Sequence, residues 1–170
     1  LAGVHPLYGL SPGADEWYIS RRTRLILRLG RESAAAAAAA LQGAALQIGS
    51  QRVEVGTAAE RALVYSTVIY SKFVAIGPAS AAGEAVTEDA FLAACRAQCD
   101  ALGIRPRLVC GKAQRAQTPA GLLSGFSLML YDLEREEILR LQREGLGIER
   151  KRGCGIFIPH KSGASVRDIE

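Results

Sequence analysis

The chain has 170 residues, 49% of them apolar, which is enough to bury one ordinary hydrophobic core or two small ones. This composition excludes intrinsic disorder as the state of the whole chain. The net charge of +4 suits many proteins besides those that bind nucleic acids, so the total charge does not select a function.

The first 62 residues predict the order strand, strand, helix, strand. The opening ten residues contain Pro6 and two glycines, which predict a segment between elements. Two short runs rich in aromatic and branched residues predict a hairpin with its turn near Arg21 and Arg22. An alanine-rich run then predicts a helix that stops at Gly43. The predicted elements are strands over 16–20 and 23–29, a helix over 31–43, and strands over 45–49 and 52–56.

From residue 63 the pattern reads strand, helix, strand, strand, helix, strand. Thr87 and Asp132 are the expected N-caps of the two helices, and Gly103 and Gly145 are their expected ends. A polar loop is expected between the two middle strands. The predicted elements are a strand within 63–77, a helix over 87–103, strands within 106–112 and 125–133, a helix over 132–145, and a strand over 154–159.

This second order is that of a ferredoxin-like, split βαβ domain. We therefore predict an α+β protein with two tandem ferredoxin-like (RRM-like) domains, residues 1–62 and residues 63–170. The first domain would lack its opening strand and helix. An RNA-recognition motif of the cellular type is disfavoured, because "SGFSLML" lacks the aromatic spacing that stacks bases.

The four cysteines, Cys95, Cys99, Cys110 and Cys154, include no C-x-x-C pair. They predict reduced and mostly buried thiols rather than a zinc site or a disulfide framework. No acidic or histidine cluster has metal-ligand spacing, so no metal or cofactor is expected. The uncharged run from Ser33 to Gln51 contains Gln, Gly and Ser and is a poor membrane span. We expect a cytoplasmic protein that does not contact a membrane.

Residues 145–161, "GLGIERKRGCGIFIPHK", place two G-x-G pairs around a basic turn. The dinucleotide fingerprint is excluded because Arg150 stands where the third glycine belongs. A phosphate loop is excluded because neither Gly147 nor Gly153 is followed by Lys-Ser or Lys-Thr. Glycines let a backbone approach a phosphate closely, and the neighbouring arginines and lysine supply charge. A helix C-cap followed by a turn would explain Gly145 but not the other three glycines.

This stretch, preceding the last strand of a ferredoxin-like tandem, resembles the glycine-rich loop of the repeat-processing Cas endoribonucleases. These enzymes belong to the repeat-associated RNA-binding superfamily of CRISPR systems. The matching residues are Gly145, Gly147, Arg150, Gly153 and Gly155. "GVHP" at residues 3–6 also resembles a family segment that follows the first helix, which implies that the family's first strand and helix precede Leu1.

The resemblance implies metal-independent cleavage of precursor crRNA by the 2′-hydroxyl next to the scissile phosphate, which leaves a 2′,3′-cyclic phosphate. It also implies two kinds of partner, the stem-loop of CRISPR repeat RNA and other Cas subunits of an effector complex. Such a reaction needs a base, an acid and a cation or donor for the developing charge. His5 lies near the place where related enzymes keep a catalytic histidine, and Tyr8 follows as a proton or hydrogen-bond donor.

The expected RNA contacts come from two basic clusters, the glycine-rich loop and the residues around them. They are Arg21, Arg22, Arg24, Lys112, Arg115, Gly145, Gly147, Arg150, Lys151, Arg152, Gly153, Gly155, His160 and Lys161. A structural loop histidine and a packed tyrosine remain the alternatives for His5 and Tyr8. Two alternatives remain for the whole chain, a non-cleaving RNA-binding subunit of an effector complex and a ferredoxin-like regulatory or metabolic domain unrelated to RNA.

Overall fold

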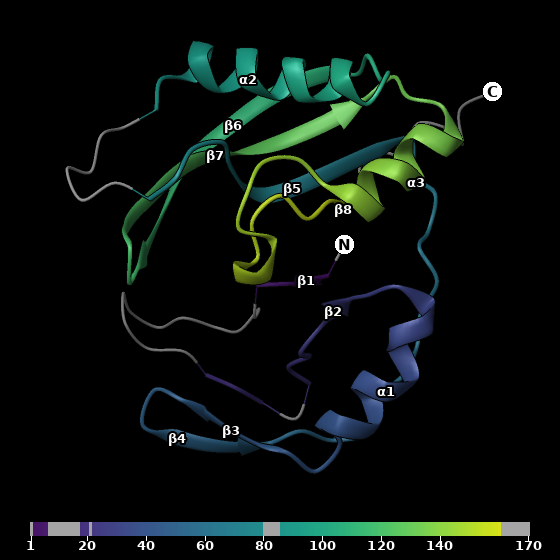
Figure 1. Cartoon of the computed structure of the whole chain (residues 1–170), viewed down its shortest axis with the longest axis vertical. Helices are drawn as coiled ribbons and strands as arrows, with labels where there is room; N and C mark the ends of the chain where they lie inside the picture. The colour runs from purple at the N-terminus through teal and green to yellow at the C-terminus, as the bar shows by residue number, and fades with distance from the viewer. Residues whose placement is uncertain (1, 7–17, 21, 80–85, 161–170) are drawn as a thin grey trace.

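A computed structural model of the chain describes residues 2–6, 18–20, 22–79 and 86–160 (Figure 1). Its C-terminal part is a four-stranded antiparallel sheet with the strand order β6-β7-β5-β8. The elements are β5 (Val68–Ala75), α2 (Glu88–Ala101), β6 (Arg107–Thr118), β7 (Gly121–Tyr131), α3 (Arg135–Glu144) and β8 (Ile158–Pro159). The central strands of the sheet are β5 and β7, which are the first and third strands of this part in chain order. This order confirms the predicted α+β, ferredoxin-like arrangement.

The predicted N-cap residue is correct for one of the two helices of this part and wrong for the other. Thr87 caps α2 as predicted, because its Oγ1 accepts a hydrogen bond from the Ala90 amide at 3.3 Å. The predicted Asp132 cap of α3 is wrong. Glu134 is the N-cap instead and forms a capping box with Glu137, whose Oε2 accepts from the Glu134 amide at 2.8 Å. The reciprocal pair satisfies two helix-end amides, which a single aspartate cannot do.

The hairpin of β6 and β7 is much longer than expected. Residues 113–124, predicted largely as a polar loop, continue both strands, with register pairs such as Arg115↔Ser124 and Thr118↔Gly121. The prediction was wrong because β6 is an edge strand with an exposed face. Polar residues on such a face are compatible with pairing.

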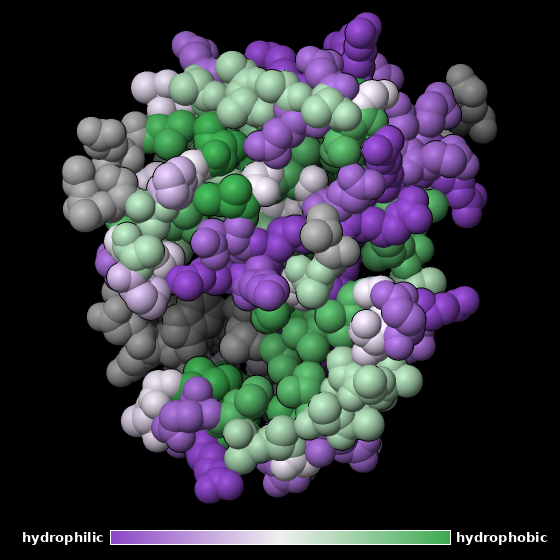
Figure 2. All heavy atoms as spheres, viewed as in Figure 1, coloured by the Kyte–Doolittle hydropathy of each residue, from purple (hydrophilic) through white to green (hydrophobic). Residues whose placement is uncertain are grey.

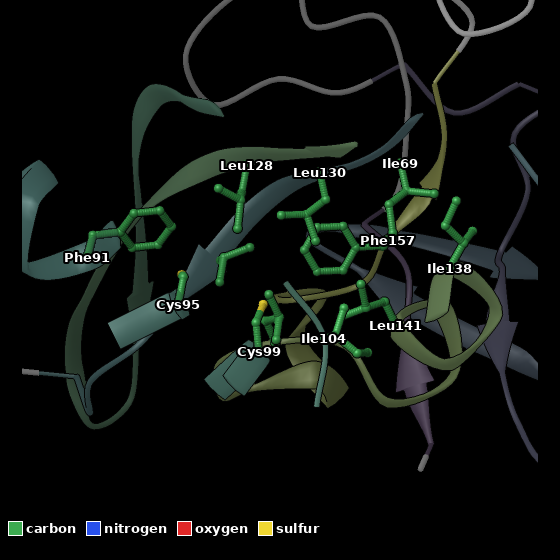
Figure 3. Packing of buried hydrophobic residues seen from close by; sticks show 12 residues of the cluster. Ile69, Phe91, Cys95, Cys99, Ile104, Leu128, Leu130, Ile138, Leu141 and Phe157 are labelled. Carbon is green, nitrogen blue, oxygen red and sulfur yellow. The ribbon is translucent and has the colours of Figure 1, made fainter. Parts of the chain in front are cut away.

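The core lies between the sheet and the two helices (Figure 3). Ile69, Leu128 and Leu130 project from the sheet toward Phe91 of α2 and Leu141 of α3. The predicted burial of the thiols is confirmed for Cys95, Cys99 and Cys154, while Cys110 is partly exposed, and all four are unpaired. Burial is the main cause that raises the pKa of Cys95 to about 12, so this thiol is unreactive at neutral pH.

The N-terminal part is built from small pieces below that sheet in Figure 1. They are β1 (Gly3–Val4), β2 (Leu27–Arg28), α1 (Arg31–Leu41), β3 (Ala45–Ile48) and β4 (Gln51–Glu54). β3 pairs with β4, and β1 pairs with β2, both antiparallel. The expectation that the opening ten residues lack an element is wrong for Gly3 and Val4. Their partner strand lies far along the chain, so no local pattern indicated it.

The predicted hairpin over 16–29 is reduced in the described residues. A turn does occur there, with the Thr23 amide bonded to the Ser20 carbonyl at 2.9 Å, but only Leu27 and Arg28 form a strand. Arg21 lies outside the described residues. The division into two ferredoxin-like domains, residues 1–62 and 63–170, stays a prediction. Within the described ranges, no helix is long and apolar enough to span a membrane.

Candidate functional site

Two segments from opposite ends of the chain meet at the glycine-rich loop. β1 lies against η1, the 3-10 turn formed by Arg150–Arg152 (Figure 1). The chain continues from β1 to His5, whose amide donates to the Ile26 carbonyl at 2.9 Å. A Cβ placed on Gly153 would lie 3.0 Å from the Pro6 ring, so this part of the loop is in close contact with the histidine segment. The tertiary structure thus joins the two sequence motifs.

The glycines shape this loop by close backbone packing. Gly145, Gly147, Gly153 and Gly155 all have positive φ. A Cβ on Gly147 would collide with the Ala75 carbonyl, and one on Gly155 with the Leu146 carbonyl. No other residue type allows these approaches without a shift of the backbone.

The glycines were expected to let backbone amides approach a phosphate, but the amides of the four glycines are already hydrogen-bonded in this structure. All four glycine amides donate within the protein, to the Leu141 carbonyl, Gln98 Oε1, the Arg150 carbonyl and the Phe73 carbonyl. Amides with such partners are not open to a phosphate oxygen. The assignment of these glycines to RNA binding stays a prediction, and their visible role is to place Arg150 beside β1.

Replacing Gly155 by alanine should destabilise the protein more than replacing Gly43. Both glycines have positive φ, but a Cβ at Gly155 meets backbone while a Cβ at Gly43 meets nothing within 4 Å. We expect about 1 kcal/mol for the backbone strain at Gly43→Ala and at least about 2–3 kcal/mol for Gly155→Ala. Denaturant unfolding of both variants measures the difference. Equal losses would contradict close packing of the loop.

His5 is a neutral imidazole at physiological pH in this setting. Its side chain is only 6% exposed, and Nε2 is buried without a hydrogen-bond partner in the described part of the chain. Burial, followed by the nearby charges of Arg28 and Arg150, lowers the pKa of His5 to about 4. A neutral imidazole whose ring nitrogen lacks a partner can accept a proton, which is the property of a general base.

Arg150 is the most unusual side chain of the site. Its Nε, Nη1 and Nη2 are all buried, and none has a hydrogen-bond partner among the residues that the structure describes. The guanidinium lies between Gly3 and Gly145, since a Cβ at either position would approach it. Burial lowers the pKa of Arg150, and the charge of Glu144 opposes this effect. Because a guanidinium carries five donors and stays charged, an anion that reaches Arg150 would find donors that no described residue occupies.

Arg28 is a member of the site that the sequence did not indicate. Its Nη1 donates to the carbonyls of Gln142 at 2.6 Å and Phe157 at 3.0 Å. Burial, followed by the charge of Arg150, lowers the pKa of Arg28 to about 10, so it too is cationic at neutral pH. In the sequence, Arg28 is one of five arginines within residues 21–31, and nothing local distinguishes it from Arg22 or Arg24.

The other predicted RNA contacts lie on different surfaces. Lys151 and Arg152 are exposed on η1, where Figure 2 shows hydrophilic side chains gathered, and Arg152 pairs with Glu149 at 3.0 Å. Lys112 and Arg115 are exposed on the edge strand β6. Arg22 and Arg24 are exposed near the Ser20–Thr23 turn. His160 follows the opposite edge strand β8, and its ring lies 5.7 Å from that of Tyr70. The remaining predicted site residues, Tyr8, Arg21 and Lys161, lie outside the described residues.

Among the described residues, no group of three or more His, Cys, Asp or Glu side chains is arranged to hold a metal ion. The described part of the site contains the imidazole of His5, the buried guanidinium of Arg150 and the part-buried guanidinium of Arg28.

Comparison with known proteins gives two matches. Residues 1–162 match the family described as "Cas6 Crispr". Over 165 residues the chain is 32% identical to the CRISPR-associated endonuclease Cas6 of Myxococcus xanthus (strain DK1622). That alignment covers 97% of this chain and 68% of the relative.

Proposed function

The chain belongs to the Cas6 CRISPR family, and we propose that it is an endoribonuclease that cuts CRISPR repeat RNA without a metal ion, with His5 as its general base. One observation carries the proposal. Among the described residues, a neutral imidazole whose Nε2 has no hydrogen-bond partner lies close to a guanidinium for which no acceptor is present. The first group can take a proton, and the second can stabilise the negative charge that develops on a phosphate.

The chemistry follows from these two groups. His5 Nε2 removes the proton of the 2′-hydroxyl, and the resulting O2′ attacks the adjacent phosphorus. The O2′–P bond forms while the P–O5′ bond breaks, which gives a 2′,3′-cyclic phosphate and a 5′-hydroxyl. The leaving O5′ takes up a proton, for which we propose Tyr8 as the donor. Arg150 donates to the non-bridging oxygens as negative charge builds on them.

Both groups are buried, so we propose that the segments covering them move to admit the phosphate. The energetics favour such a step. A buried guanidinium without acceptors is costly. Arg150 has none among the residues that the structure describes, and a phosphate would supply both a charge and acceptors. RNA binding would thus release a cost that the free protein carries.

Recognition of the RNA would rest on exposed cations on several surfaces of the protein. We propose phosphate contacts by six exposed residues: Lys151 and Arg152 on η1, Lys112 and Arg115 on β6, and Arg22 and Arg24 near the N-terminal turn. We propose that the product RNA stays bound, and that other Cas subunits join the protein on it in an effector complex.

The proposal is tested by mixing the protein with labelled repeat RNA in EDTA. We expect cleavage at one position, with a cyclic phosphate on the upstream fragment. A matched RNA with a 2′-deoxy nucleotide at that position should bind with similar affinity and stay intact, because the nucleophile is missing. Binding without cleavage of the natural RNA would favour the non-cleaving RNA-binding subunit. No binding at low salt would leave the family's substrate unassigned for this chain.

A further inference from the structure

Arg28 connects the histidine segment to both ends of the glycine-rich loop. Gln142 lies near the end of α3, three residues before Gly145, and Phe157 lies two residues after Gly155. Arg28 Nη1 donates to the carbonyls of both residues, at 2.6 Å and 3.0 Å. One side chain therefore closes the base of the loop that carries Arg150.

Arg28 also belongs to the strand that holds the histidine segment. It is paired with Gly3 in the register of β1 and β2, and the carbonyl of Ile26, two residues before it, accepts from the His5 amide. The backbone of this short ribbon fixes His5, while the Arg28 side chain fixes the loop. Arg28 therefore contributes to the relative position of His5 and Arg150, together with the contact of β1 with η1.

The region is reinforced on its far side by Gln142. The side chain of Gln142 is buried, and its Nε2 donates to the Val64 carbonyl at 2.8 Å. The side-chain hydrogen bond to Val64 therefore also fixes the backbone of Gln142, whose carbonyl accepts from Arg28. Because charge-assisted hydrogen bonds are stronger and shorter than neutral ones, Arg28 is bound to a rigid frame.

We propose that Arg28 is a positioning residue that clasps both ends of the glycine-rich loop and so holds Arg150 in register with His5. The inference rests on the proposed cleavage by His5 for its catalytic consequence. Arg28 itself has no part in proton transfer, since its guanidinium stays protonated and is engaged with two carbonyls. Its effect on cleavage should pass entirely through the geometry of the other two groups.

The first test is a double-mutant cycle on single-turnover cleavage of repeat RNA. Arg28→Met should slow cleavage by about 10²-fold, because small misplacements of reacting groups cost about this much. In the Arg150→Met background, the same change should cost less than about 3-fold, since the group that Arg28 positions is gone. Arg31→Met is the matched control, an arginine three residues along whose side chain is 94% exposed, and it should leave cleavage unchanged. Equal losses in both backgrounds would overturn the positioning role while leaving the proposed function intact.

A second measurement does not depend on cleavage. Arg28 of β2 and Arg150 of η1 are the charged groups that lower the pKa of His5, and Glu144 of α3 acts on Arg150. An NMR titration of the labelled His5 ring should show its pKa rising in Arg28→Met and staying low in Arg28→Lys, which keeps the charge. Arg28→Lys also serves if the methionine variant does not fold, because it should slow cleavage while its His5 titration stays close to that of the unmodified protein. If the unmodified protein does not cleave RNA, the proposed function fails. The clasp would then be overturned only if the Arg28 variants left the His5 titration and the loop amide resonances unchanged.

Discussion

Replacing His5 by alanine is expected to slow cleavage of repeat RNA by about 10²–10⁴-fold, equivalent to about 3–5 kcal/mol of barrier. The affinity for the RNA should stay nearly constant, because recognition would rest on phosphate contacts and the shape of the stem-loop rather than on one neutral imidazole. Single-turnover cleavage and equilibrium binding of the same variant measure the two effects separately. Added imidazole should restore part of the lost rate, which a purely structural role of His5 would not allow. Normal cleavage by the His5→Ala protein would remove His5 from the mechanism.

The proposed role of His5 as a base also predicts the direction in which the cleavage rate changes with pH. Burial, with Arg28 and Arg150, lowers the pKa of His5 to about 4, and a base works in its neutral form. The value of kcat/KM, which reports on the free enzyme, should therefore be insensitive to His5 between about pH 5 and pH 8 and should fall below about pH 4. If His5 acted as an acid in the free enzyme, the same pKa would make the rate fall as the pH rises above about 4. A limb near the unperturbed value of about 6.5 would contradict the buried environment.

Replacing Arg150 by methionine should move activity and stability in opposite directions. Cleavage should fall by about 10²–10³-fold, the usual loss when one donor to a developing oxyanion is removed. The free energy of unfolding measured without RNA should rise, by about 1–4 kcal/mol, because a buried cation that has no acceptor among the described residues is replaced by an apolar side chain of similar length. Lys151→Met is the matched comparison. Lys151 is exposed, so its replacement should change the free energy of unfolding by less than about 0.5 kcal/mol and reduce the slope of log K against log salt by about 0.7–0.9.

Thermal or denaturant unfolding without RNA and single-turnover cleavage with RNA together decide this prediction. A loss of stability in Arg150→Met would show that the guanidinium is satisfied in the free protein. An unchanged cleavage rate would show that it does not meet the reacting phosphate.

The conformational strain of the loop is consistent with this division of roles. Gly147 and Gly155 approach backbone carbonyls so closely that no side chain fits, and Glu149 has a left-handed backbone just before Arg150. Strained backbone of this kind persists only where the surrounding structure holds it. Here it is held by β5 on one side and by β1 and Arg28 on the other, and the result is that Arg150 lies in the interior instead of in solvent with Lys151 and Arg152.

The sequence by itself determined the order of elements in the C-terminal part, the caps of α2, the positions of the glycine-rich loop and its likeness to the repeat-processing Cas endoribonucleases. The elements and their caps depend on local propensity and hydrophobic periodicity, and each can be identified within a short window. The likeness to the family is a resemblance carried by the residues of the glycine-rich loop. The N-cap of α3 and the length of the β6–β7 hairpin were missed for reasons that are also nearly local. A capping box competed with the aspartate, and an exposed edge strand looked like a polar loop.

Only the tertiary structure decided what the site is made of. It paired Gly3 with Arg28, brought Arg150 beside β1, and gave the glycine amides partners inside the protein. Burial and two neighbouring cations made His5 neutral, and no feature of the residues around His5 in the sequence indicates those cations. Pairing, burial and electrostatic neighbours are set by contacts between residues far apart in the chain, whereas a sequence pattern reports only the preferences of residues that are close together.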